Sequence, residues 1–244
     1  KSRISAYRIK IGRSKYKKYH KVMNQIAEQY GADPCVITAT WGVETAYGGY
    51  KGNFTVIKSL ASLAYDGRRT AFFRTELLHA LHIVNDGHIS VKDFKGEWAG
   101  GSGHAQFLPS SWRKYAVDYT GDGKKDIWNN KLDAFASIAN YYHMNGWEPG
   151  EPWGVQVQIP SNIPKSMING YKVKKPMNTW LSMGVKVARG WQLPHENYPA
   201  YLVRPHGGPE YMVFPNFRVI MRYNNSTFYA LSVSYLADKI CQRR

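Results

Sequence analysis

The sequence predicts an α+β protein that is mainly α and carries a small β-containing insertion in its C-terminal half. Residues 1–148 contain apolar positions at helical spacing, interrupted by Gly and Pro. Residues 149–213 are rich in Pro and Gly and contain short alternating runs, such as Val155 to Ile159, that are typical of strands. A helical pattern returns near the C-terminus. With 43% hydrophobic residues among 244, the chain can bury a full core.

Capping residues mark the ends of the expected helices. Asp33 caps a helix that Pro34 opens and Gly48 closes, and a helix before it is expected from Tyr16 to Tyr30. Further helices are expected at residues 55–65, 70–84, 110–118, 133–145 and 227–241, the last with Ser226 as its cap.

The chain is strongly basic, with 33 Lys and Arg against 17 Asp and Glu and a formal charge of +16. Such a charge predicts attraction to a polyanion, which could be nucleic acid, anionic lipid or a cell wall with carboxylate-bearing peptide stems. A surplus that serves mainly solubility is the alternative. The sequence contains no recognisable nucleic-acid motif, so no specific nucleic-acid partner is expected.

The two cysteines, Cys35 and Cys241, have no metal-ligand or Cys-x-x-Cys spacing. This argues against a structural zinc site and against a redox motif. A disulfide between them and two small buried thiols remain alternatives at this point.

Glu44 is the most informative single residue. Ile37, Trp41, Glu44 and Gly48 fall on one helical stripe, which places one carboxylate among apolar neighbours. Burial disfavours the charged form, so this glutamate should keep its proton to a higher pH than in water, as a general acid for glycosidic cleavage must. A capping or salt-bridged glutamate near a helix end is the other interpretation, and periodicity alone does not exclude it.

Several motifs lie in a fixed order along the chain: Trp41 to Thr45 (WGVET), Gln106 to Ser111 (QFLPSS), Asp118 to Gly123 (DYTGDG), Ala139 to Tyr141 (ANY) and Arg222 to Ser226 (RYNNS). Together they resemble the lytic murein transglycosylase B family, with an SLT-type domain, over nearly the whole chain. The likeness is weakest in residues 1–14 and 147–209. The resemblance implies a lysozyme-like helical catalytic domain of residues 1–148 and 214–244, with residues 68–95 lining the groove and residues 149–213 as the insertion.

The resemblance also implies a reaction. Glu44 would protonate the leaving glycosidic oxygen between N-acetylmuramic acid and N-acetylglucosamine in peptidoglycan. As a carboxylate it would then deprotonate the 6-hydroxyl of the same muramic sugar, which forms a 1,6-anhydro end. One carboxylate is enough for this reaction, whereas an ordinary glycosidase requires a second Asp or Glu.

The resemblance implies two groups of substrate-binding residues. The first lines the groove with flat side chains and hydrogen-bonding tips, and comprises Gln106, Tyr141, Tyr223 and Tyr229. The second is the pair Arg68 and Arg69, whose guanidinium groups suit the carboxylates of the peptide stems.

Glu97 is the clearest departure from the family's pattern, because the family commonly has Ser at this position. If Glu97 faces Glu44, the two like charges would interact and raise one pKa, or Glu97 would position a water and divert some turnover to hydrolysis. The alternative is a loop glutamate that faces outward.

The segment that begins at Asp118 has the spacing of an EF-hand calcium loop. Oxygen-bearing side chains stand at positions 1, 3, 5 and 9 and a Gly at position 6, but Asn129 replaces the usual Glu at position 12. The family resemblance offers Asp133 as a later ligand. The expected ligands of a structural Ca²⁺ are therefore Asp118, Thr120, Asp122, Lys124 and Asp133, and the alternative is a polar turn. No cofactor is expected for catalysis.

The sequence and its family resemblance therefore predict a monomeric lytic transglycosylase that acts on peptidoglycan glycan strands, with cell-wall or envelope machinery as further partners. No apolar run approaches the length of a membrane span, about 18 residues, and the segment Lys1 to Lys18 is basic and unlike a signal peptide. The chain as given is therefore expected to be soluble, and a signal peptide or lipid-anchored leader removed before Lys1 is compatible with this expectation. The expected location is the periplasm of a Gram-negative bacterium, in soluble form or tethered to the outer membrane. A non-catalytic peptidoglycan-binding module and a lysozyme-like hydrolase that uses Glu97 are the alternatives.

Overall fold

The computed structural model describes residues 4–243, so the outermost residues of the predicted domains, 1–3 and 244, lie outside the described part. The chain forms two compact units, Lys1–Met144 and Asn145–Arg244. The first contains the helices and strands α1 (Ala6–Tyr30), α2 (Pro34–Thr45), β1 (Phe54–Thr55), α3 (Val56–Tyr65), α4 (Thr70–Asn85), β2 (Lys95–Gly96), α5 (Pro109–Tyr115) and α6 (Lys131–Met144).

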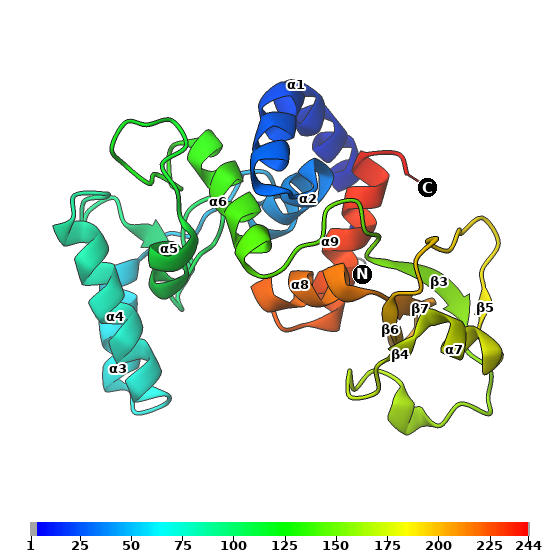
Figure 1. Ribbon diagram of the computed structural model, residues 1–244. Helices are drawn as coiled ribbons and strands as arrows, with labels where there is room; N and C mark the ends of the chain where they lie inside the picture. Colours follow the sequence, from blue (N-terminus) through cyan, green and yellow to red (C-terminus); the bar gives the residue numbers. More distant parts are fainter. Residues whose placement is uncertain (1–3, 244) are drawn as a thin grey trace. The chain divides into compact units, whose positions relative to one another are not determined.

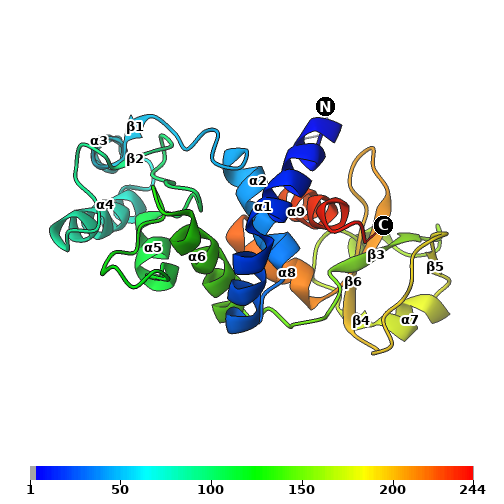
Figure 2. The same cartoon turned by 90° about the horizontal axis from the view of Figure 1, so that it is seen from above.

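The core of the first unit lies where α1, α2 and α6 pack together, as Figure 2 shows. The ring of Trp41 on α2 makes edge-to-face contacts with Tyr19 on α1 and Phe135 on α6, with centroid distances of 6.1 and 4.9 Å. Trp41 and Phe135 are fully buried. Aromatic pairs of this kind stabilise a core beyond the area that they bury, so α2 is fixed from two sides.

Several helix boundaries differ from those predicted, among them the end of α5, which lies at Tyr115 instead of Asp118. Helix α1 begins at Ala6 instead of Tyr16, because the Ser5 hydroxyl caps it by accepting from the Arg8 amide. Helix α2 ends at Thr45 instead of Gly48, because Ala46 and Tyr47 both adopt left-handed backbone angles. The helix therefore stops one residue after Glu44.

Helices α3 and α4 form an antiparallel pair, seen side by side in Figure 1. Helix α4 also packs against α5, and the buried Glu76 on α4 joins the two. The Glu76 carboxylate accepts from the Ser110 amide at 2.9 Å and from the Ser110 hydroxyl at 2.6 Å. It thereby satisfies a free amide in the first turn of α5.

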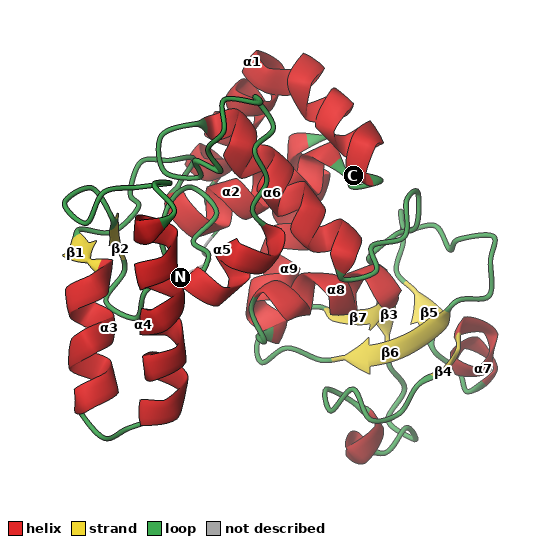
Figure 3. Cartoon of the chain, turned by 60° about the vertical axis from the view of Figure 1, so that its left-hand side comes forward, coloured by secondary structure: helices red, strands yellow, loops and turns green. Residues whose placement is uncertain are grey.

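The second unit is built on a sheet with strand order β4-β6-β7-β3-β5, in which each of these strands pairs antiparallel with its neighbours (Figure 3). The short helix α7 (Met177–Ser182) contributes Trp180, which is fully buried and donates from Nε1 to the Ala200 carbonyl at 3.0 Å. The strands are β3 (Gly154–Gln158), β4 (Lys175–Pro176), β5 (Lys186–Val187), β6 (Pro199–Val203) and β7 (Glu210–Val213), and a 3-10 turn covers Lys165–Met167. The predicted β-containing insertion and the mainly helical class are confirmed.

Helices α8 (Pro215–Tyr223) and α9 (Thr227–Ile240) complete the second unit. On α8, the buried Asn216 side chain bonds three backbone groups: it accepts from the Glu148 amide and donates to the carbonyls of Glu148 and Glu151. On α9, Asp238 accepts from Trp153 Nε1 at 3.1 Å. The assignment of residues 214–244 to the catalytic domain stays a prediction.

Neither cysteine is a free thiol, because Cys35 and Cys241 are both disulfide-bonded. Among residues 4–243, no helix has the length and apolar character that crossing a bilayer requires.

Candidate active site

Glu44 lies in the last turn of α2 and is half-buried. The same helix carries Thr40, whose hydroxyl bonds the hydroxyl of the fully buried Tyr142 on α6 at 2.6 Å. Burial, and secondarily the nearby charge of Glu44, raise the pKa of Tyr142. Tyr142 therefore stays a neutral hydrogen-bonding group beside the catalytic candidate.

The turn after Glu44 is fixed by Thr45. The buried Thr45 hydroxyl donates to the Trp41 carbonyl at 3.1 Å and accepts from the Gly48 amide at 3.0 Å. The Ala46 amide bonds the Gly42 carbonyl at 3.1 Å, which closes the helix. These bonds satisfy groups that a helix end otherwise exposes, so the backbone around Glu44 has a single well-defined path.

Trp41 connects α2 to a distant loop. Its indole Nε1 donates to His104 Nδ1 at 3.0 Å, and both side chains are buried. Burial first, and then the positive charges of Lys51 and Lys131, lower the pKa of His104 to about 4. The imidazole is therefore neutral at physiological pH, which is the form whose Nδ1 can accept the bond.

Gln106 lies on the same loop as His104, near its end, with a left-handed φ of 51°. Its side-chain amide donates to the Lys51 carbonyl at 3.2 Å and to the Gly103 carbonyl at 3.0 Å. The loop thus connects the segment after Glu44 to the strand pair formed by β1 and β2. A fixed, half-buried amide of this kind suits the hydrogen bonding of a sugar.

Glu97 stands at the start of this loop, in a tight turn. Its amide donates to the Gly101 carbonyl at 2.7 Å, and its carbonyl accepts from the Gly100 amide at 3.0 Å. Glu97 is half-buried, whereas the neighbouring Trp98 is 59% exposed. The role suggested for the Glu97 carboxylate stays a prediction.

The predicted tyrosines divide between the two units. In the first, the buried Tyr141 packs its ring 4.5 Å from Tyr115 and 5.8 Å from Phe107, counted between centroids. In the second, the rings of Tyr223 and Tyr229 stack at 6.3 Å with an interplanar angle of 14°. Tyr229 is buried and Tyr223 is half-buried.

Arg68 and Arg69 are exposed and lie directly before α4. Arg69 is the N-cap residue, with a left-handed φ of 54°, and its guanidinium lies 4.2 Å from the centre of the Phe72 ring. This stacking limits the positions of the guanidinium. The contacts of the pair with peptide stems stay a prediction.

The acidic loop before α6 gathers three of the predicted metal ligands. Asp118, Asp122 and Asp133 each place a carboxylate oxygen within 4.8 Å of the others. Asp133 is fully buried, which raises the pKa of its carboxyl, while backbone bonds from Asp126, Thr120 and Tyr119 act in the opposite direction. Three converging carboxylates fit a hard cation with oxygen ligands, such as Ca²⁺.

The other two predicted ligands face this cluster through different groups. The Thr120 hydroxyl and amide donate to Asp133, at 3.3 and 3.2 Å, and the Lys124 amide donates to Asp122 at 2.9 Å. Asn130 donates to the Thr120 hydroxyl at 2.9 Å. The loop is thus preorganised around its carboxylates by its own backbone.

A model of the transglycosylase SLT domain matches residues 1–238. The chain belongs to this family. The membrane-bound lytic murein transglycosylase B of Escherichia coli is 34% identical over 234 residues, which cover 94% of this chain and 63% of that protein. This chain therefore spans less than two thirds of the length of this curated relative. The resemblance predicted from the motifs is confirmed.

Two solved SLT-domain enzymes show the same fold. SltB3 of Pseudomonas aeruginosa, in complex with NAG-NAM-pentapeptide, is 40% identical with a TM-score of 0.92, covering 96% of this chain and 64% of that one. Slt35 of E. coli, in complex with calcium, is 31% identical with a TM-score of 0.87, covering 99% of this chain and 76% of that one. The predicted lysozyme-like fold of this SLT domain is confirmed.

Two residues that shape this site are not predicted from the sequence. His104 lies two positions before the motif that begins at Gln106, but no local pattern indicates its bond, because its partner Trp41 is 63 positions away. Glu76 was also missed, although the Pro109 start of a helix predicts that some group must satisfy the amides behind it.

We expect His104 to make the stability of the SLT domain depend on pH. Its folded pKa of about 4 lies below the value of 6.5 in an unfolded chain, so the unfolded state binds more protons between these values. The stabilisation is present above pH 6.5 and is lost as the pH falls, by about 2 kcal/mol between pH 7 and pH 4.5. Urea unfolding at both pH values should show a smaller loss for His104→Gln than for the parent. The exposed His143→Gln is the matched control, and an identical loss in all three proteins would contradict the expectation.

Proposed function

We propose that this protein is a lytic transglycosylase that cleaves the β-1,4 bond between N-acetylmuramic acid and N-acetylglucosamine and leaves 1,6-anhydro-N-acetylmuramic ends. The observation that carries the proposal is the position of Glu44, half-buried in the last turn of a helix of an SLT domain. A half-buried carboxyl at this position is suited to donate the proton that the first step requires.

The proposed reaction uses Glu44 twice. The protonated carboxyl donates its proton to the leaving glycosidic oxygen, and the bond from that oxygen to the anomeric carbon breaks. The resulting carboxylate removes the proton from the 6-hydroxyl of the muramic sugar, whose oxygen bonds the anomeric carbon. The 2-acetamido group stabilises the cation that develops between these steps, so no second protein carboxylate is needed.

The substrate is supported by the solved relatives. SltB3 is described in complex with NAG-NAM-pentapeptide and, in a second structure, with NAG-anhNAM-pentapeptide. We propose that Gln106, Tyr141, Tyr223 and Tyr229 contact the sugars of a peptidoglycan strand in this chain, with Arg68 and Arg69 directed to its peptide stems.

Glu44→Gln should reduce the release of muropeptides by about a thousandfold, because the amide can neither donate nor remove the proton. The measurement is mass spectrometry of purified peptidoglycan after digestion by the parent and by the variant. We expect 1,6-anhydro ends from the parent alone. Reducing ends from the parent would make the protein a hydrolase, and absence of cleavage by both would favour a wall-binding module.

Glu97→Ser tests the hydrolase alternative in the same assay. If Glu97 positions a water, the variant should give a higher ratio of anhydro to reducing ends than the parent. Serine restores the residue common in the family, so the comparison changes one carboxylate in an otherwise similar loop. An unchanged ratio would remove any role of Glu97 in hydrolysis.

We further propose that the loop from Asp118 to Asp133 binds one structural Ca²⁺. The convergence of its three carboxylates supports this, as does the calcium complex of Slt35. Asp133 is buried with one negative charge, and a bound cation would offset the cost of that burial. The ion would stabilise the fold beside α6 and would take no part in the reaction.

Calcium at a hundredfold excess over its dissociation constant should raise the free energy of unfolding by about 2.7 kcal/mol. Asp122→Asn should weaken calcium binding about tenfold, because it removes one of three charges while keeping the oxygen that accepts from Lys124. Calorimetric titration and thermal melting with and without a chelator would measure both effects. The exposed Asp66→Asn is the control, and equal calcium affinity in Asp122→Asn and Asp66→Asn would contradict this site.

We propose the periplasm of a Gram-negative bacterium as the place of action, because peptidoglycan lies there and the E. coli relative is named membrane-bound. Soluble and outer-membrane-tethered forms are both compatible with the fold. We expect a monomer, with other cell-wall or envelope proteins as further partners.

A further inference from the structure

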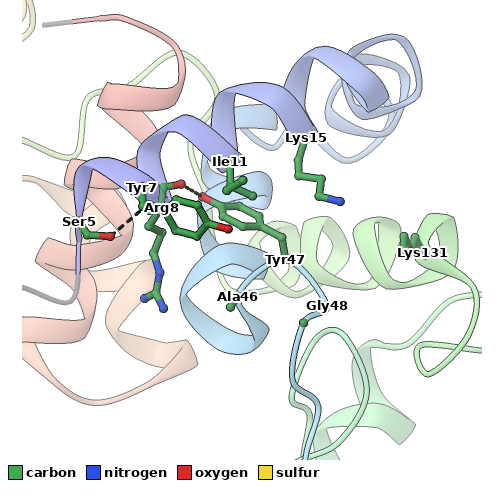
Figure 4. A pocket seen from close by; sticks show the side chains of 10 residues that line it. Ser5, Tyr7, Arg8, Ile11, Lys15, Ala46, Tyr47, Gly48 and Lys131 are labelled. Carbon is green, nitrogen blue, oxygen red and sulfur yellow. Dashed lines mark hydrogen bonds between the residues drawn. The ribbon is translucent and has the colours of Figure 1, made fainter.

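A hollow of about 550 Å³ lies in the first unit, behind the turn that follows Glu44. Figure 4 shows its walls: one comes from α1, with Ile11 and Lys15, and the facing one from the turn at Tyr47. Lys131, at the start of α6, lies at the same end as Lys15, and Arg8 lies toward the other end. The predicted catalytic and substrate-binding residues are not among those that line it.

The three cations of the hollow have no acidic partner among residues 4–243. No described carboxylate lies within 4 Å of the charged groups of Arg8, Lys15 or Lys131. Lys131 also raises the local positive potential, since its charge lowers the pKa values of Lys51 and His104. Cations that face a common space without counter-ions repel one another, and a negative ligand would reverse this cost.

The middle of the hollow is rigid and largely apolar. Tyr47 is buried and donates its hydroxyl to the Arg8 carbonyl at 3.0 Å, a bond drawn in Figure 4. Tyr47 also has a left-handed φ of 62°, and its ring fills the space beside Gly42, where an added Cβ would lie 2.5 Å from the ring. The ring therefore cannot move aside freely, and the hollow is preformed.

We propose that this hollow binds the peptide stem of a peptidoglycan strand, with stem carboxylates on Arg8 at one end and on Lys15 and Lys131 at the other. The proposal rests on the proposed function for the choice of this acidic peptide. One contact with the peptide stems is already expected at Arg68 and Arg69. The hollow would add a second, beside the turn that Ala46 and Tyr47 form after Glu44.

The shape of the hollow favours a short acidic peptide over the other polyanions. Its volume is in the range of sites that enclose a small ligand, whereas a membrane surface or a nucleic-acid duplex offers its charges on a broad convex or flat face. Cations at two ends with the ring of Tyr47 between them match a ligand whose carboxylates are separated by small apolar groups. A single phosphate would use only one end.

The test is calorimetric titration of the full chain at low salt with a synthetic stem pentapeptide, and with the same peptide after amidation of its carboxylates. The free peptide has no glycosidic bond, so binding is measured without turnover. The variant Lys15→Gln/Lys131→Gln should bind the pentapeptide about tenfold more weakly than the parent. The amidated peptide should not bind measurably to any of the proteins.

Lys17→Gln/Lys21→Gln is the matched control, because it also removes two positive charges, but from exposed positions of α1 outside the hollow. We expect it to bind as the parent does, and thermal melting shows whether both variants are folded. Equal losses in both variants, binding of the amidated peptide, or no binding to the parent would overturn the proposal. Binding of each protein to anionic vesicles is measured as well. The proposal would also be overturned if Lys15→Gln/Lys131→Gln lost binding to the vesicles but kept binding to the pentapeptide. The peptide titration does not depend on glycan cleavage. The proposed reaction can therefore be contradicted by the Glu44→Gln experiment while the peptide titration still tests the hollow.

Discussion

The hydrogen bond from Trp41 to His104 is the interaction on which the geometry around Glu44 depends. Trp41 lies one turn before Glu44, and His104 lies on the loop that carries Gln106. The bond joins two segments that are far apart in the sequence, inside a core where an unpaired indole N–H or imidazole nitrogen would be costly. It also requires neutral imidazole, which burial and the neighbouring lysines favour. Helix α2 and the loop that carries Gln106 are therefore joined by a contact that depends on the protonation state of His104.

Close backbone approaches add a second constraint on the same region. An added Cβ at Gly48 would lie 2.5 Å from His104 Cε1, and one at Gly52 would lie 2.1 Å from the Gly96 carbonyl. Both glycines also have positive φ, of 83° and 87°. Side chains at these positions would separate the segment after Glu44 from the loop before Gln106. The strand pair of β1 and β2, in which Phe54 faces Gly96, brings these two segments to the same place.

The features that the sequence predicted are those with a local signal. The Asp33 cap and Pro34 predict the start of α2, and the carboxylate spacing after Asp118 predicts an acidic loop. Each depends on residues a few positions apart. Even Asp133, which stands outside the usual loop spacing, could be included because the family motif supplied it. The early start of α1 at Ala6 was not predicted, because the basic segment before Tyr16 shows little helical periodicity of apolar residues. The structure shows that Ser5 caps the helix there.

Contacts between distant side chains had no such signal. Glu76 with Ser110 and Trp41 with His104 are single pairs at separations of 34 and 63 positions, and nothing in their neighbours' periodicity indicates them. The basic hollow could not be predicted for the same reason, since its lining comes from α1, the turn after α2 and the start of α6. Composition alone gave a charge of +16 and a list of polyanions.

The structure separates two effects of that charge. Lysines exposed along α1, such as Lys10, Lys17 and Lys21, act at long range, where they attract any polyanion and are screened by salt. Lys15 and Lys131 line a hollow of limited volume, where only a ligand of matching length can approach both ends. Attraction to a polyanion and selection of one of its chemical groups would thus come from different lysines, the first from exposed lysines of α1 and the second from Lys15 on α1 with Lys131 on α6. Because Lys15 and Lys131 lie beside the turn that follows Glu44, binding of a peptide stem there would hold the strand close to the proposed site of cleavage.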